Sequence, residues 1–282
     1  MAVKRAPKLA GVIGWPIAQS LSPLIHTIWA HRAGVDAYYI PIPVEPDYQV
    51  FARTMDSLKT VGFEGVNVTL PHKEHALRYA RSATDNARKA GAANMLTFHD
   101  DGAEADNSDI AGFTDAVREK APERTGTALI LGAGGAARGI SIALKTLGFS
   151  NIAITNRTPE KASALAELFD LQTVDWASRA AALENADLLV NTTSLGMTGQ
   201  PPLEMDLSAL KPHACVADIV YAPVETPLLA QARDRAMKTV DGLAMLMHQA
   251  APGARAWFGA DPVVDDDLRR HLVNELNRRS ET

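Results

Sequence analysis

The sequence predicts an α/β protein whose second half folds as a doubly wound parallel sheet. Two observations support this class. Short apolar runs typical of strands alternate with helix-forming segments over most of the 282 residues. A glycine-rich turn at 132–137 joins one such run directly to a helix, as in a βαβ unit. Units of this kind place their strands parallel to one another in one sheet.

The first hundred residues already show this alternation. The expected strands are 9–14, 37–44 and 65–69, and the expected helices are 23–34 and 47–60. Further along, Ile110, Phe113 and Val117 recur at helical spacing, which indicates an amphipathic helix that leaves the first domain. These elements make residues 1–108 an α/β domain of their own.

A second series begins after residue 125. Its expected strands are 127–131, 151–155, 186–191 and 214–220, and the helix 136–147 follows the first of them. We therefore expect residues 109–242 to form a Rossmann-type domain. The expected helices 242–257 and 265–279 come after its last strand. They belong to the C-terminal segment 243–282, which we expect to pack back on the first domain.

Composition excludes several classes of protein. The net charge is −5 and no long basic run occurs, so nucleic-acid binding is disfavoured. No apolar run reaches the roughly 18–20 residues that span a bilayer, and Gly11, Gly14 and Pro16 interrupt any N-terminal signal pattern. The single cysteine, Cys215, lies in an apolar run and predicts a buried strand residue rather than a reactive thiol. We expect a cytoplasmic protein.

The glycine-rich turn has the features of a dinucleotide site. The run Gly132-Ala133-Gly134-Gly135-Ala136 follows a strand and opens a helix. The first glycine permits a tight turn, and the second lets a pyrophosphate approach the main chain. The helix start then offers unpaired N–H groups and a positive dipole end to the phosphates. A plain glycine turn is the alternative interpretation.

The end of the next strand favours NADP over NAD. An NAD site usually has a carboxylate there, for the ribose 2′-hydroxyl. This chain instead has Asn156-Arg157-Thr158, with Lys161 shortly after. Arg157 can stack on adenine and pair with a 2′-phosphate, and Lys161 adds positive charge. The same residues also fit a helix start with Thr158 as N-cap and proline following, and both interpretations can hold together.

Polar clusters in the first domain indicate a small polyhydroxylated carboxylate as ligand. The clusters are Ser20-Leu21-Ser22-Pro23, Asn67-Val68-Thr69 with Lys73, Gly91-Ala92-Ala93-Asn94 and Asn107-Ser108-Asp109. They supply hydroxyls, amides, one amine and one carboxylate at strand ends and turns, where binding sites concentrate. The sequence His72-Lys73-Glu74-His75 lacks the histidine spacing of a helical zinc site, so we expect no metal.

The ordered series of motifs resembles the shikimate dehydrogenase family, over about residues 11–260. The series consists of Gly14-Trp15-Pro16, Ser20-x-Ser22-Pro23 with His26, Asn67-Val68-Thr69-x-Pro71-x-Lys73, Gly91-x-x-Asn94, Asp109, Gly132-x-Gly134-Gly135-Ala136, Asn156-Arg157-Thr158 and Gly242-x-x-Met245-Leu246-x-x-Gln249. The resemblance implies reversible NADPH-dependent reduction of 3-dehydroshikimate to shikimate, in aromatic amino acid biosynthesis. It makes 1–108 the substrate domain and 109–242 the NADP domain.

The resemblance also assigns roles by position. It implies that Ser20 and Ser22 hold the substrate carboxylate and that Tyr221 contacts the substrate from the cofactor domain. The substrate hydroxyls are assigned to Asn67, Thr69, Asn94, Asp109 and Gln249. Ile219 and Gly242 are expected near the nicotinamide, and Asp85 matches an acidic position near the cofactor. The oligomeric state stays open, with a homodimer as one option.

Reaction chemistry points independently to Lys73 and Asp109. Hydride addition to a ketone leaves a developing alkoxide that must be stabilised and protonated. Lys73 can supply the proton or the positive charge, and Asp109 can orient Lys73 or the reacting hydroxyl. Together they argue against a non-catalytic NADP sensor, which would need only the nucleotide motif.

Four positions depart from the commonest family pattern, namely Thr27, Met95, Ile110 and Ala244. None of them removes a side chain assigned above. They leave open a paralogue that acts on quinate or a related cyclohexanol acid.

Overall fold

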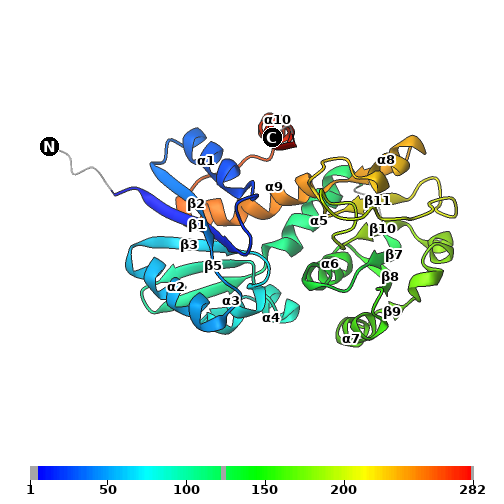
Figure 1. The fold of residues 1–282 in the computed structure, drawn as a ribbon, viewed down its shortest axis with the longest axis horizontal. Coiled ribbons are helices and arrows are strands. Elements are labelled where there is room, and N and C mark those ends of the chain that lie inside the picture. Colours follow the sequence, from blue (N-terminus) through cyan, green and yellow to red (C-terminus); the bar gives the residue numbers. More distant parts are fainter. Residues whose placement is uncertain (1–5, 122–124, 281–282) are drawn as a thin grey trace. The chain divides into compact units, whose positions relative to one another are not determined.

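A computed structural model describes residues 6–121 and 125–280 (Figure 1). Contacts divide the chain into two compact units. The first unit is Met1–Ser108 with Gln249–Leu272, and the second is Asp109–His248 with Val273–Thr282. The sequence assigned the whole of 243–282 to the first domain, whereas 243–248 and 273–282 group with the second unit. Within the described residues, no helix is long and apolar enough to cross a bilayer.

The first unit is built on a six-stranded mixed sheet with the order β2-β1-β3-β5-β6-β4. The strands are β1 (Lys8–Gly14), β2 (Ala37–Pro43), β3 (Phe63–Val68), β4 (Ser82–Ala83), β5 (Met95–His99) and β6 (Gly102–Asp106). The helices are α1 (Ser22–Arg32), α2 (Tyr48–Thr60), α3 (Lys73–Tyr79) and α4 (Asp85–Ala90). Strand β1 runs parallel to β2 and β3, and β5 runs antiparallel to β3 and β6.

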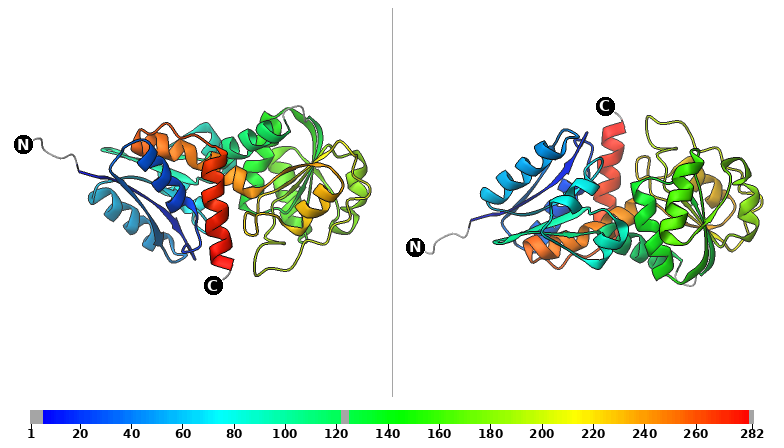
Figure 2. Two further views of the ribbon diagram at one scale, coloured as in Figure 1. Left: turned by 90° about the horizontal axis from the view of Figure 1, so that it is seen from above. Right: turned by 90° about the horizontal axis from the view of Figure 1, so that it is seen from below.

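Helices cover both faces of this sheet, α1 on one and α2 on the other (Figures 1 and 2). Phe51 and Met55 of α2 pack with Val66 and Leu96 in one core. The opposite core contains Trp257 and Phe258, which belong to the C-terminal segment. There the Trp257 indole packs so closely on Gly65 that an added Cβ would lie 2.2 Å from its Nε1 atom. Trp257 and Phe258 are therefore part of the first unit's core.

The second unit is a parallel sheet with the order β12-β11-β10-β7-β8-β9. Its strands are β7 (Gly126–Leu131), β8 (Phe149–Thr155), β9 (Gln172–Thr173), β10 (Leu188–Asn191), β11 (Cys215–Asp218) and β12 (Lys238–Val240). Its helices are α5 (Ser108–Lys120), α6 (Gly135–Thr146), α7 (Pro159–Phe169) and α8 (Pro227–Asp234). Numbered from β7, this is the strand order 3-2-1-4-5-6 of the Rossmann fold. The predicted doubly wound sheet is confirmed.

Two cores lie on the two faces of this sheet. Residues of α5, α6 and α7 pack on one face and residues of α8 on the other. Cys215 is fully buried in β11, as predicted. Helix α9 (Gly242–Gly253), which continues as a π turn over Ala254–Phe258, and helix α10 (Asp266–Ser280) follow the last strand. The sequence predicted both helical segments.

Candidate functional site

The glycine-rich turn links β7 to α6 at the centre of the parallel sheet. Gly132 has φ +99°, a backbone conformation that favours glycine. Gly134 precedes the first turn of α6 and makes no side-chain cap, and that first turn contains no acidic residue. A Cβ at Gly134 or Gly135 would meet no atom within 4 Å. The helix start therefore leaves its N–H groups accessible to an anion in open space.

Two neighbouring strands hold this turn in place. The Asn156 side chain, at the end of β8, accepts a hydrogen bond from the Ala133 N–H at 3.2 Å and donates one to the Thr158 carbonyl at 2.9 Å. The Thr192 hydroxyl, after β10, donates to the Leu131 carbonyl at 2.8 Å. Asn156, which the sequence predicts to bind the cofactor, thus also fixes the main chain of the turn through its hydrogen bond with Ala133.

Two exposed cations follow β8. Arg157 and Lys161 are both exposed, and α7 starts between them at Pro159. Thr158 occupies the N-cap position, but its side chain makes no cap hydrogen bond. The helix-start interpretation therefore accounts for the backbone here and leaves the side chains of Arg157, Thr158 and Lys161 open to a ligand.

Three further predicted residues lie around the end of β11. Ile219 is half-buried and donates its N–H to the Asn191 carbonyl at 3.1 Å. Gly242, at the start of α9, approaches so closely that an added Cβ would lie 2.3 Å from the Ile219 carbonyl oxygen. Tyr221 is half-buried, and burial raises the pKa of its phenol. Any larger residue at 242 would push α9 away from this strand end.

The sequence did not indicate a role for Asp218, a buried carboxylate at the end of β11. Asp218 is 2% exposed and accepts hydrogen bonds from the Val220 N–H at 3.0 Å, the Asn191 side-chain amide at 3.0 Å and the Thr226 hydroxyl at 2.8 Å. Burial raises its pKa to about 6, against the effect of these three donors. A single aspartate ending an apolar strand carries no signal of this role in sequence.

The first unit gathers four polar side chains into one hydrogen-bonded cluster. The Asn94 side-chain oxygen accepts from the Ser108 N–H at 2.7 Å, and its amide donates to Gln249 Oε1 at 3.3 Å. The Asn67 amide donates to the Asn94 carbonyl at 3.2 Å. The chain thus brings together Asn67 and Asn94 with Gln249, 155 positions further on. Ser108 also belongs to this cluster; the sequence placed it in the polar run Asn107-Ser108-Asp109 but gave it no role of its own.

The other predicted residues of the first unit lie at the ends of its strands. After β1, the Ser22 N–H donates to Ser20 Oγ at 3.2 Å, so the two serines share one tight turn. Thr69 follows β3, is half-buried and donates its N–H to the Ile13 carbonyl of β1. Parallel pairing of β1 and β3 therefore places both polar segments at one edge of the sheet.

Lys73 is the first residue of α3 and is half-buried. Its carbonyl accepts from the Ala93 N–H at 2.9 Å, which ties the lysine segment to the residue beside Asn94. Asp109 lies in the first turn of α5, is half-buried and groups with the second unit. The pairing of Lys73 with Asp109 thus remains a prediction.

Asp85 occupies a different setting from the other predicted residues. It begins α4, with its side chain 79% exposed and 2.9 Å from the Arg88 guanidinium. The hydrogen bond from Arg88 lowers the pKa of the carboxyl group. Its assignment to a cofactor stays a prediction.

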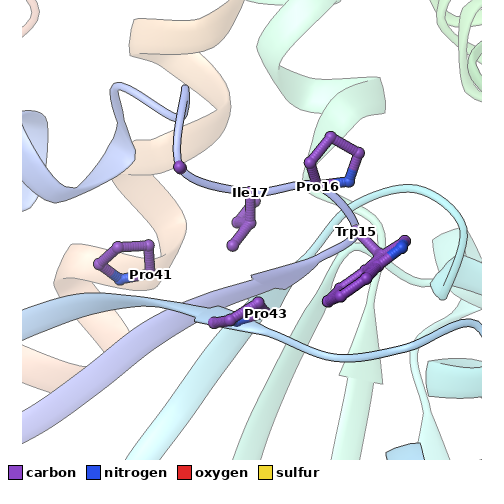
Figure 3. A pocket seen from close by; sticks show the side chains of 6 residues that line it. Trp15, Pro16, Ile17, Pro41 and Pro43 are labelled. Atoms are coloured by element: carbon purple, nitrogen blue, oxygen red, sulfur yellow. The ribbon is translucent and has the colours of Figure 1, made fainter.

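A cavity of about 230 Å³ lies between the segment that follows β1 and the end of β2 (Figure 3). It is lined by Trp15, Pro16, Ile17, Ala18, Pro41 and Pro43. Because its walls are almost entirely apolar, it does not suit a polyhydroxylated anion. None of the predicted substrate residues lines it. Among the described residues, no group of three or more metal-ligating side chains occurs.

Comparison with known proteins gives consistent matches over the chain. Residues 12–96 match the family described as shikimate dehydrogenase substrate binding domain, and residues 116–241 match shikimate / quinate 5-dehydrogenase. The shikimate dehydrogenase (NADP(+)) of Acidiphilium cryptum is 50% identical over 95% of this chain and 97% of its own length.

Two solved structures illustrate the structural similarity. Shikimate 5-dehydrogenase from Thermus thermophilus, in complex with NADP(H) and shikimate, has a TM-score of 0.83 at 30% identity and covers 95% of this chain and 99% of its own. Quinate dehydrogenase from Corynebacterium glutamicum, in complex with NAD, has a TM-score of 0.89 at 28% identity, with the same coverage of 95% and 99%.

Proposed function

The chain belongs to the shikimate dehydrogenase family, and we propose that it catalyses the reversible NADPH-dependent reduction of 3-dehydroshikimate to shikimate. The observation that carries the proposal is the cluster of Asn67, Asn94 and Gln249 in the first unit. This cluster supplies amide groups at the edge of the sheet where β1 and β3 end, and Ser20 and Ser22 follow β1 at the same edge. This is the donor set that a polyhydroxylated carboxylate requires.

The second unit fits NADP. Its uncapped α6 start and the open space at Gly134 and Gly135 suit a pyrophosphate. Arg157 and Lys161 are the cations that would hold the 2′-phosphate, with Thr158 as a hydroxyl donor beside them. Asn156 keeps Ala133 in place, and Ile219 and Gly242 shape the main chain where the nicotinamide would bind. NADPH supplies the hydride when it is bound.

Substrate recognition is assigned to the first unit, with one contribution from the second. Ser20 and Ser22 would donate to the substrate carboxylate, since hydroxyl donors to an anion form the stronger class of hydrogen bond. The ring hydroxyls would meet Asn67, Thr69, Asn94 and Gln249. Tyr221 would add a contact from the second unit. The first unit is thus proposed as the substrate domain and the second as the NADP domain.

Lys73 and Asp109 are proposed as the catalytic pair. As the ketone is reduced, negative charge develops on its oxygen, and the Lys73 ammonium can stabilise that charge and deliver the proton. The Asp109 carboxylate can keep Lys73 protonated and oriented by accepting a hydrogen bond from it. In the reverse direction the same groups accept the proton of the reacting hydroxyl.

A spectrophotometric assay tests this proposal. Oxidation of shikimate, of quinate and of no added alcohol is followed at the absorbance of the reduced cofactor, with NADP and with NAD. We expect turnover with shikimate and NADP, and far lower kcat/KM with NAD. Absence of turnover with shikimate and either cofactor would refute the proposed function.

Quinate oxidation is the second candidate function. It is favoured by the similarity to the quinate dehydrogenase of Corynebacterium glutamicum and by the family described as shikimate / quinate 5-dehydrogenase. The same assay decides between the two, because a quinate enzyme would show the higher kcat/KM with quinate.

A further inference from the structure

We propose that Tyr39 is a positioning residue for substrate recognition. Its hydroxyl fixes the Asn67 side chain so that Asn67 offers an N–H donor, and not its carbonyl oxygen, to the substrate. The inference rests on the proposed function in one respect, since it takes Asn67 to contact the substrate. No sequence motif marks Tyr39, which lies in the middle of β2.

The orientation of the Asn67 amide follows from the chemistry of its neighbours. The Asn94 main-chain carbonyl can only accept hydrogen bonds, and it lies 3.2 Å from Asn67 Nδ2. The nitrogen must therefore face Asn94, and the oxygen must face the other way. There Asn67 Oδ1 accepts the Tyr39 hydroxyl at 2.7 Å. The two contacts agree on one orientation, and an amide flip would put two acceptors against each other.

This arrangement leaves Asn67 with a donor to offer. One N–H of its amide is used by Asn94, and the second N–H is the donor that we assign to a substrate oxygen. The Asn67 side chain is 5% exposed and Tyr39 is equally buried. A buried N–H without a partner is costly, so a substrate oxygen placed there gains affinity, whereas a ring carbon lacking oxygen leaves the N–H unpaired.

A stack of aromatic rings holds Tyr39 in position. The His26 ring lies parallel to the Tyr39 ring at 4.0 Å between centroids, with 4° between their planes. Phe258 and Trp29 pack edge-on against His26 from the other sides. Burial lowers the pKa of His26 to about 3, so the imidazole is neutral at physiological pH and adds no charge beside Asn67. The phenol hydroxyl therefore has little freedom to leave Asn67.

The test is the variant Tyr39→Phe, which keeps the ring stack and removes only the hydroxyl. Tyr38→Phe is the matched control, because Tyr38 is the preceding residue of β2 and its side chain points to the solvent, 59% exposed. Equilibrium Kd values are measured for NADPH and for shikimate. We expect Tyr39→Phe to weaken shikimate binding about tenfold and to leave the Kd for NADPH unchanged. Tyr38→Phe should match the wild type in both.

A panel of shikimate analogues, each lacking one ring hydroxyl, separates positioning from a general loss of structure. For the analogue without the hydroxyl that Asn67 binds, the effect of Tyr39→Phe should shrink to less than about twofold, because the interaction is already absent. The effect of Asn67→Ala on the Kd should likewise be smallest for that same analogue. Equal weakening against every analogue, or wild-type binding by Tyr39→Phe, would overturn the proposal.

The proposed function is judged separately, from turnover of shikimate by the wild-type enzyme. If the wild type instead turns over quinate, the same panel is built from quinate. The comparison of Tyr39→Phe with Tyr38→Phe then decides the role of Tyr39 in the same way.

Discussion

Arg157 is exposed two residues after the end of β8, and its guanidinium can pair with a 2′-phosphate. We expect Arg157→Ala to raise the KM for NADP roughly 10- to 100-fold, because a charge-assisted hydrogen bond is worth about 1.5–3 kcal/mol. The kcat should stay close to that of the wild type, as for any loss of uniform binding. Steady-state kinetics measure both values. Arg53→Ala, at another exposed arginine, removes the same charge and should change neither.

Substitutions at Ser20 and Ser22 should weaken the binding of shikimate and not that of the cofactor. Removing either hydroxyl deletes a donor to the substrate carboxylate, so Ser20→Ala and Ser22→Ala should each weaken shikimate binding by about 1.5–3 kcal/mol. The affinity for NADPH should not change, because both serines belong to the first unit. Titration with each ligand separates the two effects. Unchanged shikimate KM values in both variants would place the carboxylate elsewhere.

Tyr39 shows why single residues were harder to predict than motifs. In the run Ala37-Tyr38-Tyr39-Ile40 a shift of one position exchanges the two faces of the strand, and the sequence does not fix that register. Pairing with β1 decides it, leaving Tyr39 buried and Tyr38 exposed. Asn67 and Asn94, in contrast, lie in recognisable motifs, and the structure joins them by a hydrogen bond.

At the scale of elements, Asp218 links the ends of β10 and β11 and makes stability depend on pH. Because its folded-state pKa of about 6 lies above the ordinary 3.8, the native state binds this proton more tightly than the unfolded chain. Its contribution to stability is complete below about pH 4 and is lost as the pH rises through about 6. The difference between the two pKa values corresponds to roughly 3 kcal/mol.

Asp218→Asn should remove this part of the pH dependence. An amide can still accept from Val220 and Asn191, and its N–H₂ can donate to the Thr226 hydroxyl. We expect the free energy of unfolding of the wild type to fall relative to that of the variant between pH 4 and pH 7. Urea unfolding at each pH measures it. Glu204→Gln, at an exposed acid of the same unit, is the control, and parallel pH profiles for all three proteins would contradict this account.

The longer elements were predictable because their periodicity is strong. The strands β7, β8 and β10 and the helices α2 and α6 appear within a few residues of their expected positions. The hairpin of β5 and β6 and the short helices α3, α4 and α8 were not predicted. Each of these three helices has eight residues or fewer, too few to establish a period, and they form through tertiary packing.

At the scale of the whole molecule, the proposed mechanism needs one residue from each unit. Lys73→Ala should lower kcat by about 10²- to 10⁴-fold, the usual worth of positioned acid–base catalysis. Asp109→Asn keeps the size of the side chain but removes its charge, and it should be slow as well. If the two residues act together, the double variant should be barely slower than the poorer single one.

Steady-state kcat for the two single variants and the double variant, with NADPH binding by fluorescence, measures this coupling. Lys89→Ala, at an exposed lysine of α4, is the control for loss of charge. Near-normal turnover in Lys73→Ala would remove Lys73 from the chemistry. Multiplicative losses would mean that Lys73 and Asp109 contribute independently.

The contribution of Trp257 to the first unit has a consequence for the chain as it leaves the ribosome. Strands β1 to β6 emerge early, but the indole that packs on Gly65 is synthesised about 150 residues after Ser108. At roughly 5–20 residues per second, one face of that nascent sheet stays uncovered for on the order of 10 s. The β7–β12 sheet is complete by Val240. The core residues of the second unit extend only to Met245, so all of them are synthesised before Trp257. We therefore expect the uncovered face of the N-terminal sheet to bind a chaperone during translation.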